Sequence, residues 1–463
     1  MSVDNSRIAK NTVYLYIRMI FVLGANFFAV RVLLEALGVE DYGLFNLIVG
    51  FVTLFTLLNG AMQSTVQRFL CFELGKETGG DTKAVFAVCL VLFAALAGLI
   101  LIASETIGLW FVNCKLNIPP GRERSAAIVY QLSILVMLAK TVQIPFTALI
   151  VSYERMGVFA KISIVEAALT LGAAMALKFL SGDLLIWYAS LYTLATLIVG
   201  TVYAGFCRVH FVEARFPRRI DKACFRSLGS FFSWSVLGAV ATVLRQQGLN
   251  VILNVYLGVA FNATWALANK IGTAANQLVV NFQQAFNPQI VKLWAAGDRK
   301  SLFALIDSSS KWSFALVWIV ALPLLVFTEF FLGLWLKGEQ PPQLVLFVRF
   351  AVLDFVFNAL AGPFWMTIQS TGRIALYQVQ ASVIFSAAFF VGWVLLIAGA
   401  PAWTVAASNA CIGFCCFVYR VIFTHVRVGY PLGRYFLRIL FPLFLFALVS
   451  ACALFWCKET LAW

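Results

Sequence analysis

The chain has 463 residues, of which 62% are hydrophobic and only 12% are Asp, Glu, Lys or Arg, whereas charged residues make up about 25% of an ordinary soluble domain. This composition excludes a water-soluble globule and leaves no room for a separate soluble domain. The net charge of +14 would suggest nucleic acid in a soluble protein. In a membrane protein, basic residues gather in cytoplasmic loops instead, so no nucleic-acid partner is predicted.

Apolar runs bounded by charged residues, Gly or Pro recur along the whole chain, and each is near or above the about 20 residues that one bilayer crossing requires. We expect thirteen membrane-spanning helices, which are in chain order Asn11–Glu35, Tyr42–Gln67, Lys83–Ala103, Ala126–Val151, Gly157–Leu180, Leu184–Cys207, Gly229–Leu257, Ala260–Val291, Lys311–Gly333, Pro342–Gln369, Ile374–Ala398, Ala402–Thr424 and Phe436–Cys457.

The distribution of basic residues orients these spans. With the N-terminus in the cytoplasm, the inner loops hold about three basic residues for each one outside, which is the bias that membrane insertion favours. The loop Arg208–Arg226 alone holds six of them. We therefore predict a multi-pass protein with a cytoplasmic N-terminus.

Two halves of the chain resemble each other at a nearly constant offset. The Leu-Gly-Val triplet Leu37–Val39 recurs at Leu257–Val259, and Gly80–Lys83 recurs at Gly297–Lys300. A third pattern, Pro-Phe-x5-Ser-x2-Arg, occurs twice, as Pro145, Phe146, Ser152 and Arg155 and as Pro363, Phe364, Ser370 and Arg373. The offsets are 220, 217 and 218 residues, and both members of each pair hold the same place in the helix order. Because six crossings return the chain to its starting side, the halves should be parallel repeats with the substrate path between them.

This duplication predicts the domain organisation. Residues 1–209 form an N-terminal lobe with helices one to six, and residues 210–228 form a basic cytoplasmic linker. Residues 229–427 form a C-terminal lobe with helices seven to twelve, and residues 428–463 add a thirteenth helix.

The expected spans contain seven ionisable residues: Arg18, Lys140, Glu166, Arg245, Lys270, Arg349 and Asp354. Each costs about 2.5–3.5 kcal/mol at a helix centre, so each needs a partner, a wet cavity or a function. Arg18, Arg245 and Lys270 have no evident acidic neighbour in the sequence, and we predict that they line a cavity. An excess of cations inside the membrane suits an anionic cargo.

The acidic members of this set have simpler explanations. Lys140 and Glu166 lie at comparable depth on consecutive helices, which predicts a structural ion pair. Asp354 lies about 140° around its helix from Arg349, so we expect it to pair with Arg245 or Lys270 or to bind a coupling proton.

Amide side chains repeat at helical spacing in the second, seventh and eighth spans. The repeats comprise Asn59, Gln63 and Gln67, then Gln246, Asn250 and Asn254, and finally Lys270, Gln277, Asn281 and Gln284. One interpretation is a wet groove lined by the first two helices of each half. The other is hydrogen bonding between packed helices, which contributes about 0.6–2 kcal/mol per contact and needs no transport.

The sequence lacks the motifs of several other classes of protein. It has no Gly-rich loop ending in Gly-Lys-Ser/Thr for a nucleotide, no His-Glu-x-x-His and no Cys/His spacing for a metal. We therefore predict no enzyme, no cofactor and no metal site.

Several of these motifs are shared with a known family. They are Arg31 with Leu37–Phe45 (LGVEDYGLF), the segment Phe286–Asp298 (FNPQIVKLWAAGD) and the two Pro-Phe patterns. Over its first twelve spans the chain resembles the bacterial O-antigen and capsule flippases of the Wzx type, in the superfamily that also contains the MATE multidrug exporters. The resemblance implies an all-α polytopic membrane protein with two six-helix lobes in a V, and the thirteenth run departs from it.

The resemblance also implies a function and a location. Such proteins lie in the bacterial cytoplasmic (inner) membrane and move a lipid-pyrophosphate-linked oligosaccharide to the periplasmic leaflet by alternating access, using an ion gradient. The expected partners are a polyprenyl-pyrophosphate-linked oligosaccharide, membrane lipid and glycan-assembly proteins. The oligomeric state stays open, with a monomer favoured.

Residue roles follow from this substrate. A diphosphate carries about two negative charges, and Arg and Lys can replace its water. We assign the pyrophosphate to Arg18, Arg245 and Lys270, the sugars to Gln63, Gln246, Asn250, Gln277 and Asn281, and a coupling ion to Asp354.

Three alternatives remain open. A MATE-type drug or metabolite antiporter shares the architecture but prefers an acidic cavity. A membrane glycan polymerase or ligase is disfavoured by the short outward loops. A structural scaffold is disfavoured by polar stripes in the middle of helices.

Overall fold

The computed structural model describes residues 5–53, 59–76, 80–114, 118, 121–214, 222–335 and 343–460. Nearly all of these residues are helical, and no strand occurs among them. Within this part of the chain, 11 helices are long and apolar enough to cross a membrane. The chain is an all-α, multi-pass membrane protein, as predicted.

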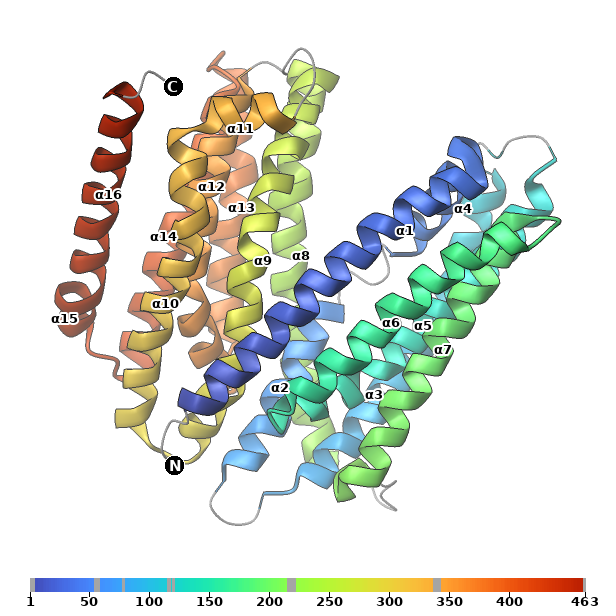
Figure 1. The fold of residues 1–463 in the computed structure, drawn as a ribbon. Helices are drawn as coiled ribbons and strands as arrows, with labels where there is room; N and C mark the ends of the chain where they lie inside the picture. Colours follow the sequence, from blue (N-terminus) through green and yellow to red (C-terminus); the bar gives the residue numbers. More distant parts are fainter. Residues whose placement is uncertain are drawn as a thin grey trace. The chain divides into compact units, whose positions relative to one another are not determined.

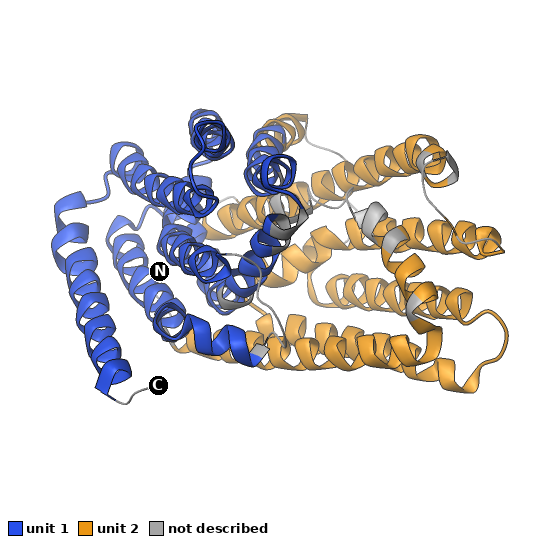
Figure 2. Ribbon diagram, turned by 90° about the horizontal axis from the view of Figure 1, so that it is seen from above, with its two compact units in different colours: residues 1–4, 233–463 blue, residues 5–232 orange. Residues whose placement is uncertain are grey.

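The chain folds as two compact units, which Figure 2 shows in different colours. Unit 2 comprises residues 5–232 and unit 1 comprises residues 233–463 with the first four residues. Unit 2 holds the helices α1 (Asn5–Thr53), α2 (Asn59–Gly75), α3 (Thr82–Ala103), α4 (Leu109–Cys114), α5 (Glu123–Ser152), α6 (Met156–Ala176) and α7 (Leu184–His210), labelled in Figure 1.

The boundary between the units lies inside helix α8 (Lys222–Leu257). Unit 1 continues with α9 (Val259–Ala295), α10 (Arg299–Val326), α11 (Thr328–Trp335), α12 (Leu344–Ser370), α13 (Ala375–Ile397), α14 (Trp403–Val428), α15 (Leu432–Tyr435) and α16 (Phe441–Thr460). Of the linker predicted at 210–228, residues 215–221 lie outside the described residues, and α8 begins at Lys222.

Helix packing repeats from one unit to the other. In unit 2, α5 packs against α2, α3 and α7, and α6 packs against α7. In unit 1, α12 packs against α9, α10 and α14, and α13 packs against α14. The short helices α4 and α11 occupy the same place in the helix order. The predicted duplication of six-helix bundles is therefore confirmed.

Helix ends repeat with the same chemistry. The side chain of Asp81 accepts a hydrogen bond from the Ala84 amide and begins α3, and Asp298 does the same with the Ser301 amide at the start of α10. These are N-caps, in which an aspartate satisfies an amide that has no partner within its own helix. Both residues belong to the duplicated Gly-Asp segment.

The duplicated Leu-Gly-Val triplets mark a second shared backbone feature. Gly38 interrupts α1 with φ 76° and ψ 173°, and Gly258 precedes α9 with φ 86° and ψ −176°. This combination of dihedral angles is essentially restricted to glycine. Each triplet thus introduces the break between the first and second helical segments of its unit.

Two predicted spans are absent from the 11 apolar helices, and they are the second of each half. The run Tyr42–Gln67 is divided between α1 and α2, with residues 54–58 outside the described residues. The run Ala260–Val291 lies within the 37 residues of α9, where Lys270 and several amides lower the hydropathy.

The predicted start of the span Lys311–Gly333 is wrong. Helix α10 begins at Arg299 and ends at Val326. We placed the boundary at Lys311 because charged residues precede it, but Asp298 caps the helix earlier and Asp307 is held inside the bundle. The Asp307 carboxylate accepts one hydrogen bond from the Tyr430 hydroxyl and lies 3.0 Å from Arg434 Nη2.

The thirteenth apolar run forms a continuous helical segment from Leu432 to Thr460. Its α16 part packs against α10 and lies at the edge of unit 1, as Figure 1 shows. Most of its large side chains are exposed, including Phe444, Leu445 and Trp456. A helix with such a surface is suited to contact with lipid.

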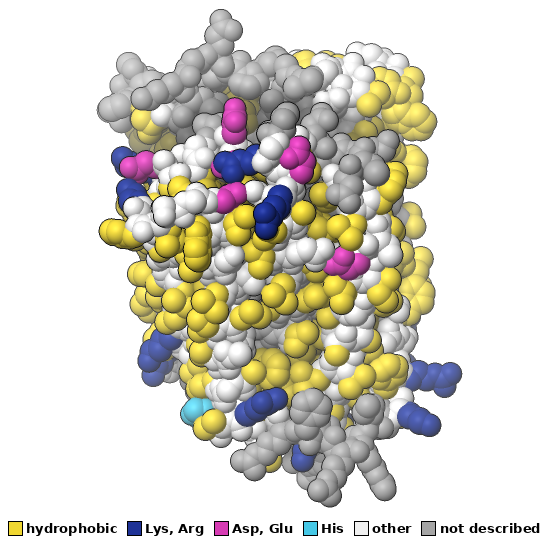
Figure 3. Space-filling model, turned by 90° about the vertical axis from the view of Figure 1, so that its right-hand side faces the viewer, with side chains coloured by type: hydrophobic (Ala, Val, Ile, Leu, Met, Phe, Trp, Pro, Cys, Tyr) yellow, Lys and Arg dark blue, Asp and Glu magenta, His cyan; other side chains and the backbone are white. Residues whose placement is uncertain are grey.

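The side-chain distribution agrees with a membrane environment. The face in Figure 3 carries hydrophobic side chains through its middle, while charged side chains gather mainly toward its two ends. On that face Asp and Glu occur together with Lys and Arg toward the upper end, and Lys and Arg predominate at the lower end.

Candidate substrate-binding site

A buried ion pair lies inside unit 1. Arg245 on α8 places Nη2 2.6 Å from Asp354 Oδ1 on α12, and the two side chains are only 8% and 11% exposed. Arg245 also donates from Nε to Asn409 Oδ1 (2.8 Å) and from Nη2 to the Asn409 carbonyl (3.1 Å). The guanidinium therefore connects three helices, α8, α12 and α14.

Close packing brings the Asp354 carboxylate into this arrangement. Asn358 Nδ2 donates to Asp354 Oδ2 at 3.2 Å. On α14, a Cβ atom at Gly413 would lie 1.9 Å from Asp354 Oδ1. Only glycine at this position leaves room for the carboxylate where it now lies.

A second arginine lies near the first, on α14. Arg420 donates from Nε to Tyr377 Oη at 2.8 Å, and its guanidinium carbon lies 5.5 Å from the Trp365 ring. The Phe385 ring lies 5.4 Å from the guanidinium carbon of Arg245 and 5.9 Å from that of Arg420. Two guanidinium groups thus share one aromatic ring inside unit 1.

Arg420 and Asn409 were not selected from the sequence, because Arg420 lies near the predicted cytoplasmic end of its span and Asn409 is a single amide in an apolar run. Their spacing holds a signal: eleven residues are about three turns, so both side chains project from one face of α14.

The expectation that Arg245 has no acidic neighbour is wrong, because Asp354 neutralises it. The alternative that Asp354 pairs with Arg245 is confirmed. Asp354 does not contact Arg349, which instead lies 3.0 Å from Glu329 Oε1. Arg245 is therefore a weaker candidate for a pyrophosphate ligand than an unpaired cation would be, since its strongest donor is already used.

Unit 2 holds a different set of intramembrane charges. Lys140 on α5 lies 3.6 Å from Glu166 on α6 and 3.2 Å from the hydroxyl of Tyr192, which confirms the predicted pair. Arg18 on α1 stacks on the Phe159 ring at 4.6 Å. Its buried Nε has no hydrogen-bond partner among the described residues, and no described carboxylate forms an ion pair with it.

Lys270, on α9 of unit 1, is exposed and forms no ion pair within the described part of the chain. The structure therefore brings Asp354 and Arg245 together, while Arg18 and Lys270 each belong to a separate part of the fold. Among the seven ionisable residues of the predicted spans, these two form no ion pair within the described part of the chain.

The predicted sugar-contacting amides differ in exposure. Gln246 on α8 and Gln277 on α9 are exposed, whereas Gln63 on α2 and Asn250 on α8 are half-buried. Asn281 is 2% exposed, and its Nδ2 has no hydrogen-bond partner among the described residues. A buried amide without a partner costs about 1–3 kcal/mol, so this donor is available for a ligand or for water.

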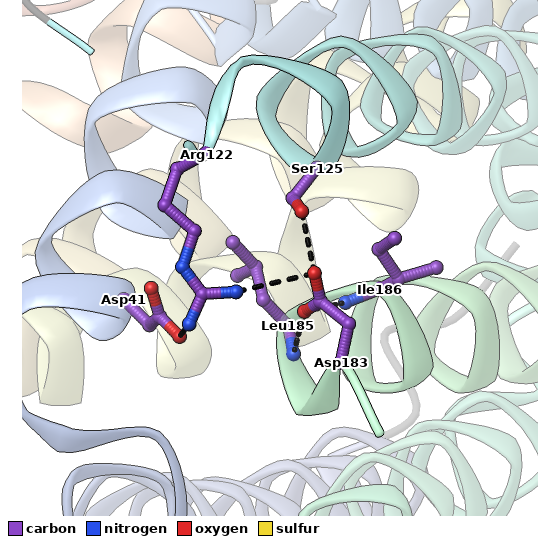
Figure 4. Close-up of polar contacts among 6 residues, drawn as sticks. All are labelled: Asp41, Arg122, Ser125, Asp183, Leu185 and Ile186. Carbon is purple, nitrogen blue, oxygen red and sulfur yellow. Dashed lines mark hydrogen bonds and ion pairs between the residues drawn. The ribbon is translucent and has the colours of Figure 1, made fainter. Parts of the chain in front are cut away.

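A polar cluster at one end of unit 2 joins three helical segments, as Figure 4 shows. Arg122, before α5, lies between two carboxylates: Nη2 is 2.5 Å from Asp41 and Nη1 is 3.2 Å from Asp183. Asp183 also accepts from the Ser125 hydroxyl and from the amides of Leu185 and Ile186 at the start of α7.

Partial burial alone would raise the pKa of Asp183, but these hydrogen bonds and the Arg122 charge together lower it. The cluster holds the α1 segment beyond Gly38 against α5 and α7 through charge pairs. Among the described residues, no group of three or more His, Cys, Asp or Glu side chains could hold a metal ion.

Comparisons with known proteins identify the class of fold. No protein-family model matches the chain, and no curated protein matches it. Among solved structures, a MOP superfamily transporter from Pyrococcus furiosus matches with a TM-score of 0.74 at 12% identity, over 93% of this chain and 99% of that one. For that transporter, the reverse polarity of the binding pocket is said to suggest a different function.

Two further structures agree. An outward-facing multidrug resistance MATE family transporter matches with a TM-score of 0.73 at 12% identity, over 93% of this chain and 99% of that one. The MATE transporter ClbM in complex with Rb⁺ matches with a TM-score of 0.71 at 15% identity, over 89% and 94%. The chain has the fold of the MATE transporters of the MOP superfamily.

Proposed function

We propose that the chain is a membrane transporter that carries a lipid-pyrophosphate-linked oligosaccharide from the cytoplasmic to the periplasmic leaflet of a bacterial inner membrane by alternating access. The fold supports the transporter class. One observation supports the anionic cargo: Arg18 and Lys270 lie in predicted spans and form no ion pair with a carboxylate among the described residues.

The cations without an ion pair favour a phosphate-bearing cargo. The Lys140–Glu166, Arg245–Asp354 and Arg349–Glu329 pairs are each neutral in total. Arg18, Lys270 and the half-buried Arg420 form no ion pair with a carboxylate among the described residues, and cations in a low-dielectric setting can replace the water of a diphosphate. A site for cationic drugs would need the opposite sign.

The amides and the ion pair have proposed roles in the same cycle. Gln63, Gln246, Asn250, Gln277 and Asn281 would bind sugar hydroxyls, while the lipid tail stays in the bilayer. Asp354 would serve as the coupling carboxylate, because a proton or cation that binds there competes directly with Arg245. In this proposal Arg245 controls ion binding at Asp354 and contributes less to binding the pyrophosphate.

A transport assay with the cargo tests the proposal. Proteoliposomes would contain a fluorescent polyprenyl-pyrophosphate oligosaccharide, and chemical quenching from outside would report its transfer between leaflets. Arg18→Ala and Lys270→Ala should each lower the rate at least about tenfold, since a charge-assisted contact contributes about 1.5–3 kcal/mol. Arg18→Lys and Lys270→Arg should retain part of the activity.

A matched control removes an exposed cation elsewhere. Lys161→Ala on α6 should transport at the wild-type rate. Unchanged transport in both Arg18→Ala and Lys270→Ala would refute the assignment of these residues. Transport of cationic dyes with no transfer of the lipid-linked oligosaccharide would instead identify a MATE-type antiporter.

A further inference from the structure

A second region of unit 1 has the properties of a ligand site. A groove of about 800 Å³ lies between α11 and the C-terminal helix α16. Phe327, Phe330 and Phe331 form one wall, and Leu454 and Cys457 form the other. The volume falls within the range of about 300–1,000 Å³ typical of small-molecule sites.

The groove is open because α16 contacts α10 at only a few positions. Trp318 Nε1 of α10 donates to Ser450 Oγ at 3.0 Å. Further along, Lys458 donates from Nζ to the carbonyl of Val326, the last residue of α10, at 3.1 Å. Leu454 lies between these two anchors on the same face of α16, and there it faces the open groove instead of a packed helix.

Charged side chains close one end of the groove. Lys458 Nζ lies 3.5 Å from Glu329 Oε2, and Arg349 Nη2 lies 3.0 Å from Glu329 Oε1. Two cations therefore share one carboxylate, which leaves the cluster with a net charge of +1. The three side chains are 27%, 35% and 56% exposed for Lys458, Arg349 and Glu329 respectively, so a ligand can reach them.

We propose that this groove binds one anionic phospholipid, with an acyl chain against the phenylalanines of α11 and the phosphate beside Lys458 and Arg349. A phosphodiester with a single negative charge neutralises the cluster. A zwitterionic lipid brings its own ammonium group and gains less from it. The site lies at the C-terminal end of α10, on the predicted outer side, and it does not depend on the proposed transport function.

Lipid titration followed by native mass spectrometry of the intact protein tests this proposal. The probes are phosphatidylglycerol and phosphatidylcholine with the same acyl chains. The wild-type protein should bind its first phosphatidylglycerol about fivefold more tightly than phosphatidylcholine, as expected for one near-surface cation. Lys458→Met should remove this preference, and Leu454→Trp should weaken the binding of both lipids by filling the groove.

A gain of affinity separates charge recognition from misfolding. Glu329→Gln raises the net charge of the cluster to +2 and should strengthen phosphatidylglycerol binding, which an unfolded protein would not do. Lys161→Met, which removes an exposed cation from unit 2, should bind both lipids as the wild type does.

Three results would overturn the proposal. They are equal affinity of the wild type for the two lipids, no response of phosphatidylglycerol binding to Lys458→Met and Glu329→Gln, and complete displacement of the lipid by glycerol 3-phosphate alone. The last would show that the apolar walls contribute nothing.

Discussion

The two units share a backbone framework and differ in what they bury. Each begins a helix with a capping aspartate, Asp81 or Asp298, and breaks its first segment with a glycine, Gly38 or Gly258. The duplicated devices determine where helices begin, break and end. They are local features, and each acts on the few residues around it.

The interiors diverge at equivalent positions. With the repeat offset of 220, the residue of unit 2 equivalent to Arg245 is Ala25. With the offset of 218, the residue equivalent to Asp354 is Val136. Both counterparts are buried, with exposures of 7% and 9%. The same bundle therefore folds with an apolar pair where unit 1 has a salt bridge. Because a buried ion pair is often no more stable than apolar residues of similar volume, we infer that the pair serves function more than folding.

Replacing one residue of this pair should give the largest loss of stability, and replacing both should give a much smaller one. Arg245→Met or Asp354→Val alone leaves one buried charge without a partner and should lower the free energy of unfolding by about 3–5 kcal/mol. The double variant replaces the ion pair by two apolar side chains, as in unit 2, and should recover most of that loss. Denaturant unfolding in detergent measures all three, and the transport assay should find the double variant folded but inactive.

An exposed pair is the matched control. Lys178 and Glu35, at 3.3 Å, are 48% and 64% exposed, so Lys178→Met should change the free energy of unfolding by about 0–1 kcal/mol. If the double variant lost as much stability as the sum of the two single variants, Arg245 and Asp354 would not be energetically coupled.

Local signals made the framework predictable. The Gly-Asp segments, the Leu-Gly-Val triplets and the Pro-Phe patterns each describe a turn or a helix end within a few residues. The predicted start of α10 is wrong because the charge of Asp307 suggested a loop residue. In the structure Arg434 neutralises the Asp307 carboxylate and Tyr430 donates a hydrogen bond to it, and both residues lie more than 100 positions away in the sequence. A sequence pattern alone does not identify such partners.

The polar site was predictable only in part, for the same reason. Lys140 and Glu166 lie on consecutive helices, so a short connection indicated their pairing. Arg245 and Asp354 are 109 residues apart, and only the tertiary structure, which brings Arg245 into contact with Asp354 on α12 and Asn409 on α14, selects this partner from several candidates. Arg420 was missed because its charge suggested a loop.

Replacing the shared glycines tests whether the framework is equivalent in the two units. Gly38→Ala and Gly258→Ala should each lower the free energy of unfolding by about 1–3 kcal/mol, because alanine is strained at these positive φ angles. No other atom lies within 4 Å of a Cβ built at either position, so the cost comes from the backbone. Thermal unfolding in detergent would compare the two.

Helical glycines with equally open surroundings provide the controls. Gly24→Ala in α1 and Gly229→Ala in α8 meet no atom within 4 Å and should be neutral or stabilising by about 0.5–1 kcal/mol. A clear loss in only one of Gly38→Ala and Gly258→Ala would show that the two breaks are not equivalent.

The smallest expected effect concerns the caps of α7 and α14, where the units differ. Asp183 caps α7 with its side chain, whereas Ala402 precedes α14 without a side-chain cap. Because the pKa of Asp183 is lowered in the folded state, its ionised form contributes stability above its ordinary pKa of about 3.9. That contribution is lost as pH falls through the lower, folded value.

Asp183→Asn keeps an oxygen acceptor for the α7 amides but removes the charge facing Arg122. Its free energy of unfolding should lie about 0.2–1 kcal/mol below the wild type at pH 6, since the pair is partly exposed. The difference should shrink as the pH falls below the ordinary pKa of aspartate and through the lower pKa of Asp183 in the folded protein. In a protein that already carries Arg122→Gln, Asp183→Asn should lower the free energy of unfolding by less at pH 6. The free energies of unfolding of wild type and Asp183→Asn could instead differ by a constant amount from pH 6 to pH 3. The charge of the carboxylate would then add no stability beyond the N-cap hydrogen bonds, and unit 2 would gain no electrostatic stability at this end over unit 1.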